Sequence, residues 1–344
     1  MPGRVRQAVH AAVSAALARL DDADLSALLG TAVPHGTGVG GTTARVRVAG
    51  HPVFVKRMPL TDTDLRRTTA NVFGLPPACH YGIGAVPSPG FGAWRELAVY
   101  ETTTRWAVSG RFPGFPLLHH ARVLPTPAPT DTPDTERAVA YWGPAVRPRI
   151  EALRTAPASL TLFLEHIPST LHDWLRARVH GPDADAACAL ADRQLAALTA
   201  FLGTTGLVHF DTHFRNVLTD GRRLHLTDHG LALSPEFALA PAEHAFHAAH
   251  LSYDDVYTRA YLARWLVTEF HGRADRLARL RAYANGARPD GMPDGAAELV
   301  RRHAAVGAVM DAFESRLGED ATTPFPAAEA AQCPSPGTGT PSSR

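Results

Sequence analysis

Residues 31–57 combine a glycine-rich segment with two short strand patterns, and this combination restricts the possible folds more than any other part of the sequence. The segment HGTGVGG runs into ARVRV, a turn at AGH, and PVFVK. Alternating side chains and β-branched residues indicate two antiparallel strands behind a glycine-rich loop. Gly36, Gly38 and Gly41 give the loop the spacing G-x-G-x-x-G. That spacing alone is weak, because it also opens dinucleotide-binding units.

The residues after the loop distinguish these two types of glycine-rich segment. A dinucleotide-binding unit needs a helix that begins in the last glycines and an acidic residue about 20 positions further on. Here the loop leads into a strand, and the residue 20 positions after Gly36 is Lys56. This context argues against a dinucleotide-binding oxidoreductase and favours a loop that covers nucleotide phosphates, followed by a lysine on a strand.

Lys56 is the only lysine in the 344 residues, and the other 33 basic side chains are all arginine. Lysine and asparagine are rare in a chain rich in Ala, Arg, Gly and Pro, a bias typical of GC-rich genomes. A single lysine that persists against this bias marks position 56 as a candidate for a role that suits a compact ammonium on a flexible stem better than a planar guanidinium.

A second group of polar residues lies at 206–233, where short β-like runs flank a polar loop in an otherwise helical half of the chain. The segment HFDTHFRN contains His209, Asp211 and Asn216 in the pattern H-x-D-x-x-x-x-N, and TDHG follows with Asp228. Phosphoryl transfer uses these residue types: a carboxylate orients the acceptor hydroxyl, while an amide oxygen and a second carboxylate hold Mg²⁺. His209 is expected to be a structural loop residue.

In their order and spacing, these motifs resemble the protein-kinase-like fold, and the resemblance covers residues from about 30 to about 285. It implies a two-lobed α+β protein with a small β-rich N-lobe and a mostly helical C-lobe. The expected boundaries are a helical extension at 1–30, the N-lobe at 31–167, the C-lobe with the catalytic and metal loops at 168–318, and a disordered tail at 319–344.

The resemblance also implies a role for each matching residue in an ATP- and Mg²⁺-dependent kinase. Gly36, Gly38 and Gly41 cover the phosphates of ATP, and Lys56 binds them while paired with a glutamate on the next helix. Asp211 is the base, and Asn216 and Asp228 are the metal ligands. The glutamate is Glu96, with Glu101 as the alternative. The backbones of Glu165 and Ile167 bind the adenine, and the side chains there are expected to carry no chemistry.

Departures from the protein-kinase pattern indicate the aminoglycoside phosphotransferase and choline kinase branch. Phe210 replaces the arginine that holds a phosphorylated activation loop, and His229 replaces the phenylalanine of D-F-G. Only about fifteen residues separate Asp228 from the PAE segment at 241–243, which is short for a platform that docks extended protein substrates. His213 follows the base where this branch often carries histidine; it either contacts the transferred phosphate or stabilises the loop.

The identity of the acceptor alcohol stays open at this point. Either a small molecule or Ser/Thr of a biosynthetic precursor peptide fits, and a peptide acceptor would bring a partner lyase. The irregular segments 58–93 and 124–136 are expected to form the acceptor site. A pseudokinase scaffold, which binds nucleotide or a partner protein without turnover, is the alternative because D-F-G is altered.

Composition excludes several other classes of function. The formal net charge is +1, which gives no electrostatic case for binding nucleic acid or an anionic membrane surface. Three cysteines without metal-ligand spacing predict neither a disulfide framework nor a zinc site. The N-terminus is expected to form an amphipathic helix rather than a targeting segment, with Val5, Val9, Val13, Ala16, Leu17 and Leu20 on one face. A cytoplasmic location follows as an expectation.

Overall fold

The computed structural model describes residues 3–333 and shows an α+β chain that divides into two compact units. The sheet unit comprises the residues up to Pro168 together with His209–Asp211 and His225–Ala245, and the helical unit comprises the remaining residues. The sequence had assigned the segments around Asp211 and Asp228 to the helical C-lobe. They group with the sheet unit instead, because Asp228 contacts Lys56 on β3 and Glu243 contacts Arg95 on the helix that follows β3. Residues before 31 belong to the sheet unit as well.

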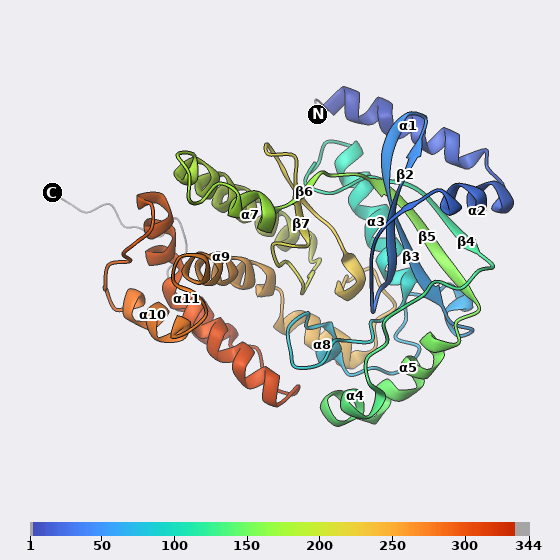
Figure 1. Ribbon diagram of the computed structural model, residues 1–344. Coiled ribbons are helices and arrows are strands. Elements are labelled where there is room, and N and C mark those ends of the chain that lie inside the picture. Colours follow the sequence, from blue (N-terminus) through green and yellow to red (C-terminus); the bar gives the residue numbers. More distant parts are fainter. Residues whose placement is uncertain (1–2, 334–344) are drawn as a thin grey trace. The chain divides into compact units, whose positions relative to one another are not determined.

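A five-stranded antiparallel sheet forms the centre of the sheet unit, in the order β1-β2-β3-β5-β4 (Figure 1). Its strands are β1 (Val33–Gly38), β2 (Gly41–Val48), β3 (His51–Leu60), β4 (Leu118–Leu124) and β5 (Ala158–Glu165). The predicted pair of strands behind the glycine loop is present as β2 and β3, and a third strand, β1, precedes the loop. Ala49 and Gly50 both have positive φ angles, as a tight turn between β2 and β3 requires.

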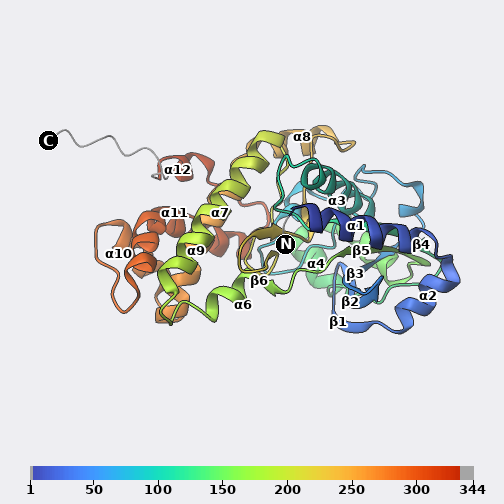
Figure 2. The same ribbon diagram turned by 90° about the horizontal axis from the view of Figure 1, so that it is seen from above.

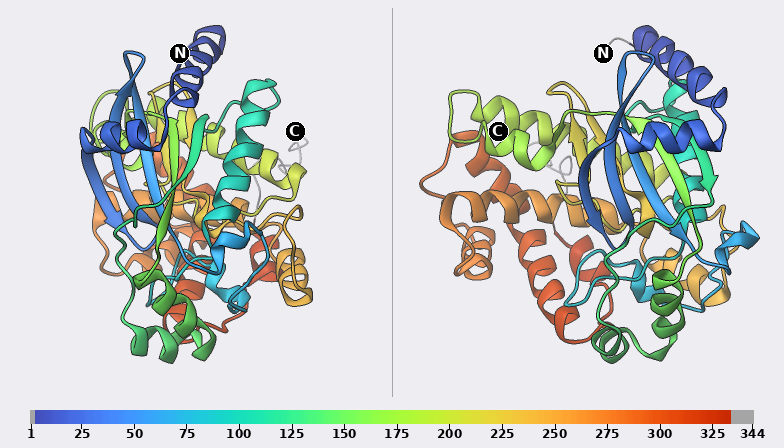
Figure 3. Two further views of the ribbon diagram at one scale, coloured as in Figure 1. Left: turned by 90° about the vertical axis from the view of Figure 1, so that its right-hand side faces the viewer. Right: turned by 45° about the vertical axis from the view of Figure 1, so that its right-hand side comes forward.

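Helices cover the two faces of this sheet, and alternation along β3 determines which residues face each of them. Helices α1 (Gly3–Ala18) and α2 (Asp22–Gly30) pack against Val53 and Val55, whereas α3 (Ala93–Val108) packs against Met58 and Leu60 (Figure 3). Lys56 lies two residues before Met58 on β3, so its side chain faces α3 as well, whereas the side chain of Arg57 faces the other way. In α1 the buried residues are Arg6, Val13 and Leu17.

Two insertions interrupt the strands of the sheet unit. Residues 61–92 join β3 to α3 through two 3-10 turns, η1 (Asp64–Arg66) and η2 (Pro77–His80). Residues 125–157 join β4 to β5 and contain α4 (Thr135–Trp142), η3 (Pro144–Val146) and α5 (Arg147–Arg154). The sequence did not predict these helices, which lie among prolines. Asp134 caps α4, and the proline in the first turn of α5 is compatible with a helix start.

The helical unit is built around α7, α9, α10 and α11, which pack against one another (Figure 2). After residue 168 the chain forms β6 (Ser169–Thr170), α6 (Leu171–Arg176), α7 (Ala184–Thr205), β7 (Val217–Thr219), β8 (Leu224–Leu226), η4 (His229–Leu231), α8 (Pro241–Ala249), α9 (Tyr253–His271), α10 (Arg276–Ala284), α11 (Asp294–Glu319) and α12 (Ala327–Ala331). Of these elements, η4 and the start of α8 lie in the sheet unit. Within residues 3–333, no helix has the length and apolar character needed to cross a membrane.

The disorder predicted for 319–344 is wrong for the part of that segment that the structure describes. After α11 the chain turns and forms α12, in which Ala330 is fully buried. The Phe325 ring lies 5.1 Å from that of Tyr253 and 6.0 Å from that of Phe313. These apolar contacts explain the packing that composition did not indicate. Residues 334–344 lie outside the described residues.

The first residue of β2 gives a test of the loop geometry. Gly41 has φ +109°, and a Cβ added there would lie 2.0 Å from the Arg57 carbonyl oxygen. Gly41→Ala should therefore destabilise the fold by about 2 kcal/mol or more, measured by urea unfolding. Gly38→Ala is the matched control, because no atom lies within 4 Å of its added Cβ. Equal stability of the two variants would contradict this assignment of Gly41.

Candidate active site

Lys56 lies at the centre of a cluster of charged side chains in the sheet unit. The β3 backbone pairs with Thr43 of β2 and Leu162 of β5 at this residue, which fixes its position in the middle of the sheet. Its Nζ atom lies 2.7 Å from Glu96 Oε1 and 2.7 Å from Asp228 Oδ1. The lysine and glutamate side chains are buried, whereas 49% of the Asp228 side chain is exposed. One ammonium therefore bridges a buried and an open carboxylate.

The pKa values of all three groups differ from their ordinary values. Burial opposes the charged form of Lys56, but the two carboxylates raise its pKa above the ordinary value. Partial loss of hydration in the site also disfavours the charge on Asp228, yet the ammonium lowers the pKa of this carboxyl overall. Burial, assisted by the charge of Asp228, raises the pKa of Glu96, although Lys56 opposes the shift. Lys56 and Asp228 are thus charged at neutral pH, and Glu96 is the group that takes up a proton most readily.

Glu96, rather than Glu101, is the partner of Lys56. It lies in the first turn of α3, where it is buried, and Glu101 on the same helix is exposed. The next turn of α3 adds Tyr100, whose hydroxyl oxygen accepts a hydrogen bond from the Asp228 N–H at 3.0 Å. Spacing of four residues places both α3 side chains on one helical face. Tyr100 is a site residue that the motifs did not identify.

Two residues with left-handed backbones lie in the segments that carry the aspartates. Phe210 has φ +65° and Asp228 has φ +61°, in a region that non-glycine residues seldom adopt. Phe210 directly precedes Asp211, whose N–H donates to Nδ1 of His209 at 3.3 Å. His229 is fully buried, with ring centroids 4.4 Å from Tyr100 and 6.2 Å from Phe115. Strain of this kind persists where surrounding contacts fix the backbone, often at functional sites.

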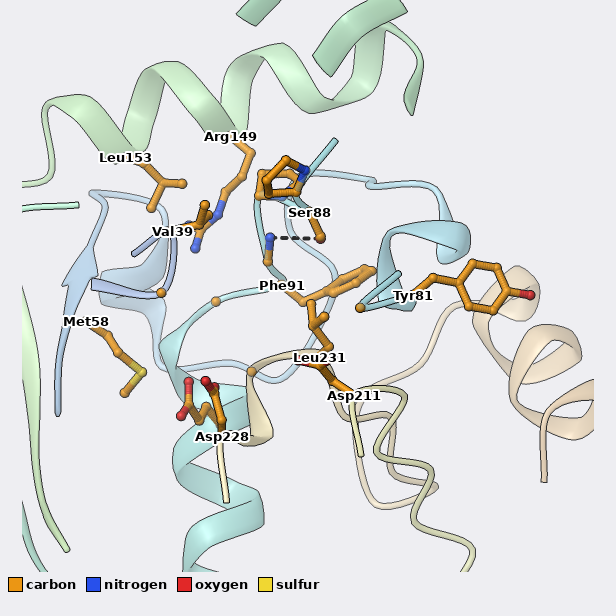
Figure 4. A pocket seen from close by; sticks show the side chains of 18 of the residues that line it. Val39, Met58, Tyr81, Ser88, Phe91, Arg149, Leu153, Asp211, Asp228 and Leu231 are labelled. Carbon is orange, nitrogen blue, oxygen red and sulfur yellow. Dashed lines mark hydrogen bonds between the residues drawn. The ribbon is translucent and has the colours of Figure 1, made fainter. Parts of the chain in front are cut away.

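The cluster opens into a pocket of about 490 Å³ within the sheet unit (Figure 4). The pocket is lined by Lys56, Glu96, Asp211 and Asp228, by Val39 and Gly40 in the turn between β1 and β2, and by residues 81–92 of the first insertion. Pockets of 300–1,000 Å³ with a few convergent polar groups are typical small-molecule sites. The structure therefore brings four of the predicted site residues to one pocket.

Of the predicted glycines, Gly36 and Gly38 lie in β1 and Gly41 begins β2. Within the glycine-rich segment, the glycine closest to Lys56 is one that the G-x-G-x-x-G spacing omits. A Cβ on Gly40 would lie 3.5 Å from Nζ of Lys56. The turn thus approaches the ammonium through Gly40, which a search restricted to the consensus positions misses.

His213 and Asn216 belong to the helical unit. Their loop is closed by local hydrogen bonds, since the His213 carbonyl accepts from the Asn216 N–H at 2.8 Å and its Nδ1 accepts from the Arg215 N–H at 3.1 Å. Within residues 3–333, no group of three or more His, Cys, Asp or Glu residues is arranged to hold a metal ion.

Glu165 and Ile167, predicted to bind adenine through their backbones, lie at and just after the end of β5. The Glu165 side chain has a structural role that the sequence did not indicate. Nε of Arg6 on α1 donates to both carboxylate oxygens, at 2.9 and 3.0 Å, and the Leu117 N–H donates to Oε2 at 3.1 Å. Burial would raise the pKa of Glu165, but the Arg6 guanidinium lowers it overall. This carboxylate fastens the N-terminal helix to the end of β5.

Comparisons with known proteins add no assignment, since neither a protein-family model nor a curated protein sequence matches this chain.

Removal of the ammonium should reveal the buried carboxylate. Lys56→Met leaves Glu96 without a countercharge, so we expect a loss of roughly 3 kcal/mol in the free energy of unfolding near pH 8. In the folded variant the pKa of Glu96 rises further above its unfolded value of about 4.3. The folded state then binds more protons, so stability is greatest at low pH and is lost as the pH rises through the raised pKa.

Urea unfolding at about pH 5 and about pH 8 measures this difference, and the loss should be smaller at the lower pH. Arg57→Met is the matched control. Among the described residues its side chain donates hydrogen bonds to uncharged groups, the Thr126 and Ser159 hydroxyls and the Pro127 carbonyl, so its loss should not depend on pH in this range. A pH-independent loss in Lys56→Met would refute the proposed role of Glu96.

Proposed function

We propose that this chain is a phosphotransferase with a two-lobed protein-kinase-like fold, which moves the γ-phosphate of ATP to an alcohol. The observation that carries the proposal is the bridge from Lys56 to Glu96 and Asp228. In kinases a strand-borne lysine pairs with a glutamate on the following helix, and the aspartate of the metal loop lies close by. Glu96 lies 40 residues and Asp228 lies 172 residues after Lys56 in the chain. The fold, not proximity in the sequence, therefore brings the three side chains together.

The charges of the cluster fit a nucleotide bound with a divalent cation. At the end of the pocket that holds the cluster, Lys56 offers one positive charge against the carboxylates of Glu96, Asp211 and Asp228, which leaves that end acidic. Asp228 is half exposed and is an oxygen ligand of the type that Mg²⁺ prefers. Asp228, with Asn216 by resemblance, would hold the ion. When bound, Mg²⁺ neutralises the negative charge of the phosphate oxygens.

The residues of the sheet unit then divide the work of the transfer. Lys56 binds phosphate oxygens and is oriented by Glu96, while the turn at Gly40 covers them. Asp211 orients the acceptor hydroxyl and takes its proton. A bond forms between the acceptor oxygen and the γ-phosphorus, and the bond from that phosphorus to the β–γ bridging oxygen breaks. ADP leaves with the electron pair of that bond.

Substitution of the base should separate binding from chemistry. Asp211→Asn keeps the size of the side chain but cannot accept the proton, so we expect turnover to fall by about 10²–10⁴-fold. Binding of ATP, followed by isothermal titration calorimetry with Mg²⁺, should change little, because the base acts mainly in the transition state. Asp62→Asn, an exposed position in the first insertion, is the control.

The same experiment tests the alternative of a pseudokinase scaffold. A scaffold binds Mg²⁺ and ATP without ADP release on any acceptor, and Asp211→Asn then has no turnover to remove. Turnover that is undiminished in Asp211→Asn would instead overturn the assignment of the base.

The single lysine of the chain allows a test with a built-in control. Lys56→Arg places a broad planar group where a compact ammonium bridges two carboxylates, so we expect kcat/KM for ATP to fall by about 10²-fold. Arg57→Lys, the reverse exchange at the adjacent position on the other face of β3, should change kcat/KM by less than about threefold. Steady-state ADP release measures both. Equal activity of the two variants would mean that position 56 has no special need for lysine.

A further inference from the structure

The wall of the pocket beside Asp211 is closed by the first insertion. A Cβ on Gly82 would lie 2.1 Å from Oδ1 of Asp211, so the backbone of this residue rests directly on the carboxylate. The neighbouring side chains hold the segment in place. Tyr81 is 3% exposed, and the His80 ring stacks on Phe91 with centroids 3.8 Å apart. This segment is therefore a packed wall of the sheet unit.

An acceptor hydroxyl must then reach Asp211 from inside the pocket. The pocket volume of about 490 Å³ suits a small molecule. A serine in an extended peptide would have to displace the wall around Gly82, together with the buried aromatic residues that support it. The geometry of the sheet unit therefore favours a small acceptor over a peptide.

The second insertion contributes a cation to the same pocket. Arg149 and Leu153 point from α5 into it, on the side opposite Asp211 and Asp228 (Figure 4). Arg149 is 4% exposed, and its Nη1 donates to Asp64 Oδ2 at 2.8 Å. Its guanidinium lies 5.2 Å from the Phe73 ring centroid, and its Nε is buried without a hydrogen-bond partner among the described residues.

The described residues therefore use only part of the donor capacity of the Arg149 guanidinium. Asp64 binds only one edge of the group, and Leu153 makes the wall beside it apolar. Such a site binds an anionic group, because a carboxylate or phosphate oxygen can accept from a guanidinium in a desolvated setting. A cationic acceptor would meet repulsion from Arg149.

The geometry points to a small hydroxylated anion as the acceptor, with its carboxylate or phosphate group bound at Arg149 and its hydroxyl directed to Asp211. This inference rests on the proposed phosphotransferase function, and it names the substrate class of that same pocket. The acceptor's anionic end supplies binding, and its other end supplies the oxygen that receives the phosphate.

Ser88 provides a substitution that tests the charge of the pocket with little risk to the fold. It lines the pocket, and its Oγ accepts a hydrogen bond from the Gly90 N–H at 3.1 Å. Ser88→Asp keeps an oxygen that can accept this bond and adds a negative charge to the wall of the pocket that Arg149 also lines. Ser88→Asn keeps the acceptor without the charge and is the matched control.

The experiment measures binding of matched compounds to the full chain by titration calorimetry, without nucleotide. The pairs are glycerate with glycerol, gluconate with sorbitol, and glycerol 3-phosphate with glycerol. We expect the anion of at least one pair to bind about tenfold or more tightly than its neutral partner. Ser88→Asp should abolish this preference, Ser88→Asn should keep it, and Arg149→Gln should reduce it. The carboxylate and phosphate arms show which anion the site favours.

No preference for any anion in the wild type overturns the inference, as does a preference that survives in Ser88→Asp. Preferential release of ADP with a serine-containing peptide would also overturn it. Titration with Mg²⁺ and ATP in parallel keeps the two proposals apart. If the wild type prefers the anion but does not bind Mg²⁺ and ATP, the phosphotransferase assignment alone is refuted. If it binds Mg²⁺ and ATP but does not prefer the anion, the acceptor class alone is refuted.

Discussion

The bridge from Lys56 to Glu96 and Asp228 is the interaction on which the arrangement of the sheet unit depends. It joins β3, α3 and the segment after β8 through one ammonium group. Burial of this charge is tolerable only because both carboxylates lie 2.7 Å away. The neighbouring glycines permit the contact, since a Cβ on Gly230 would lie 3.2 Å from Oε2 of Glu96. Small residues and a positive φ at Asp228 are therefore conditions for the electrostatic cluster.

The ion pairs of this cluster contribute less to stability than the apolar packing of the sheet unit. A buried ion pair is weak support for a fold, because desolvation offsets much of the attraction between its charges. The sheet unit has other sources of stability in the apolar clusters on both faces of the sheet. An open carboxylate at Asp228, beside a lysine that is already paired, leaves negative charge at the pocket. The cluster thus leaves an accessible carboxylate at the pocket, as the proposed binding of a cation with phosphate groups requires.

Residues whose chemistry depends on local spacing could be predicted from the sequence, and the structure brings Lys56, Glu96, Asp211 and Asp228 to one pocket. Tyr100 could have been found from its spacing of four residues after Glu96. Gly82 and Arg149 could not, because their importance comes from contacts with residues 129 and 85 positions away. Proline-rich composition concealed α4 and α5, and the polar composition after residue 318 concealed the buried contacts of α12.

Residues of the two insertions form much of the wall of the pocket beside the sheet. Arg149 from the second insertion and Asp64 from the first form a buried pair, and the same Asp64 accepts from the Thr61 N–H and hydroxyl at 3.1 and 2.8 Å. The turn after β3 is thereby fixed to α5. A guanidinium held on one edge by Asp64 keeps a defined orientation toward the pocket, since its planar donors leave little freedom. The pair therefore sets the position of the cation at this wall, and with it the length of molecule that can extend from Arg149 to Asp211.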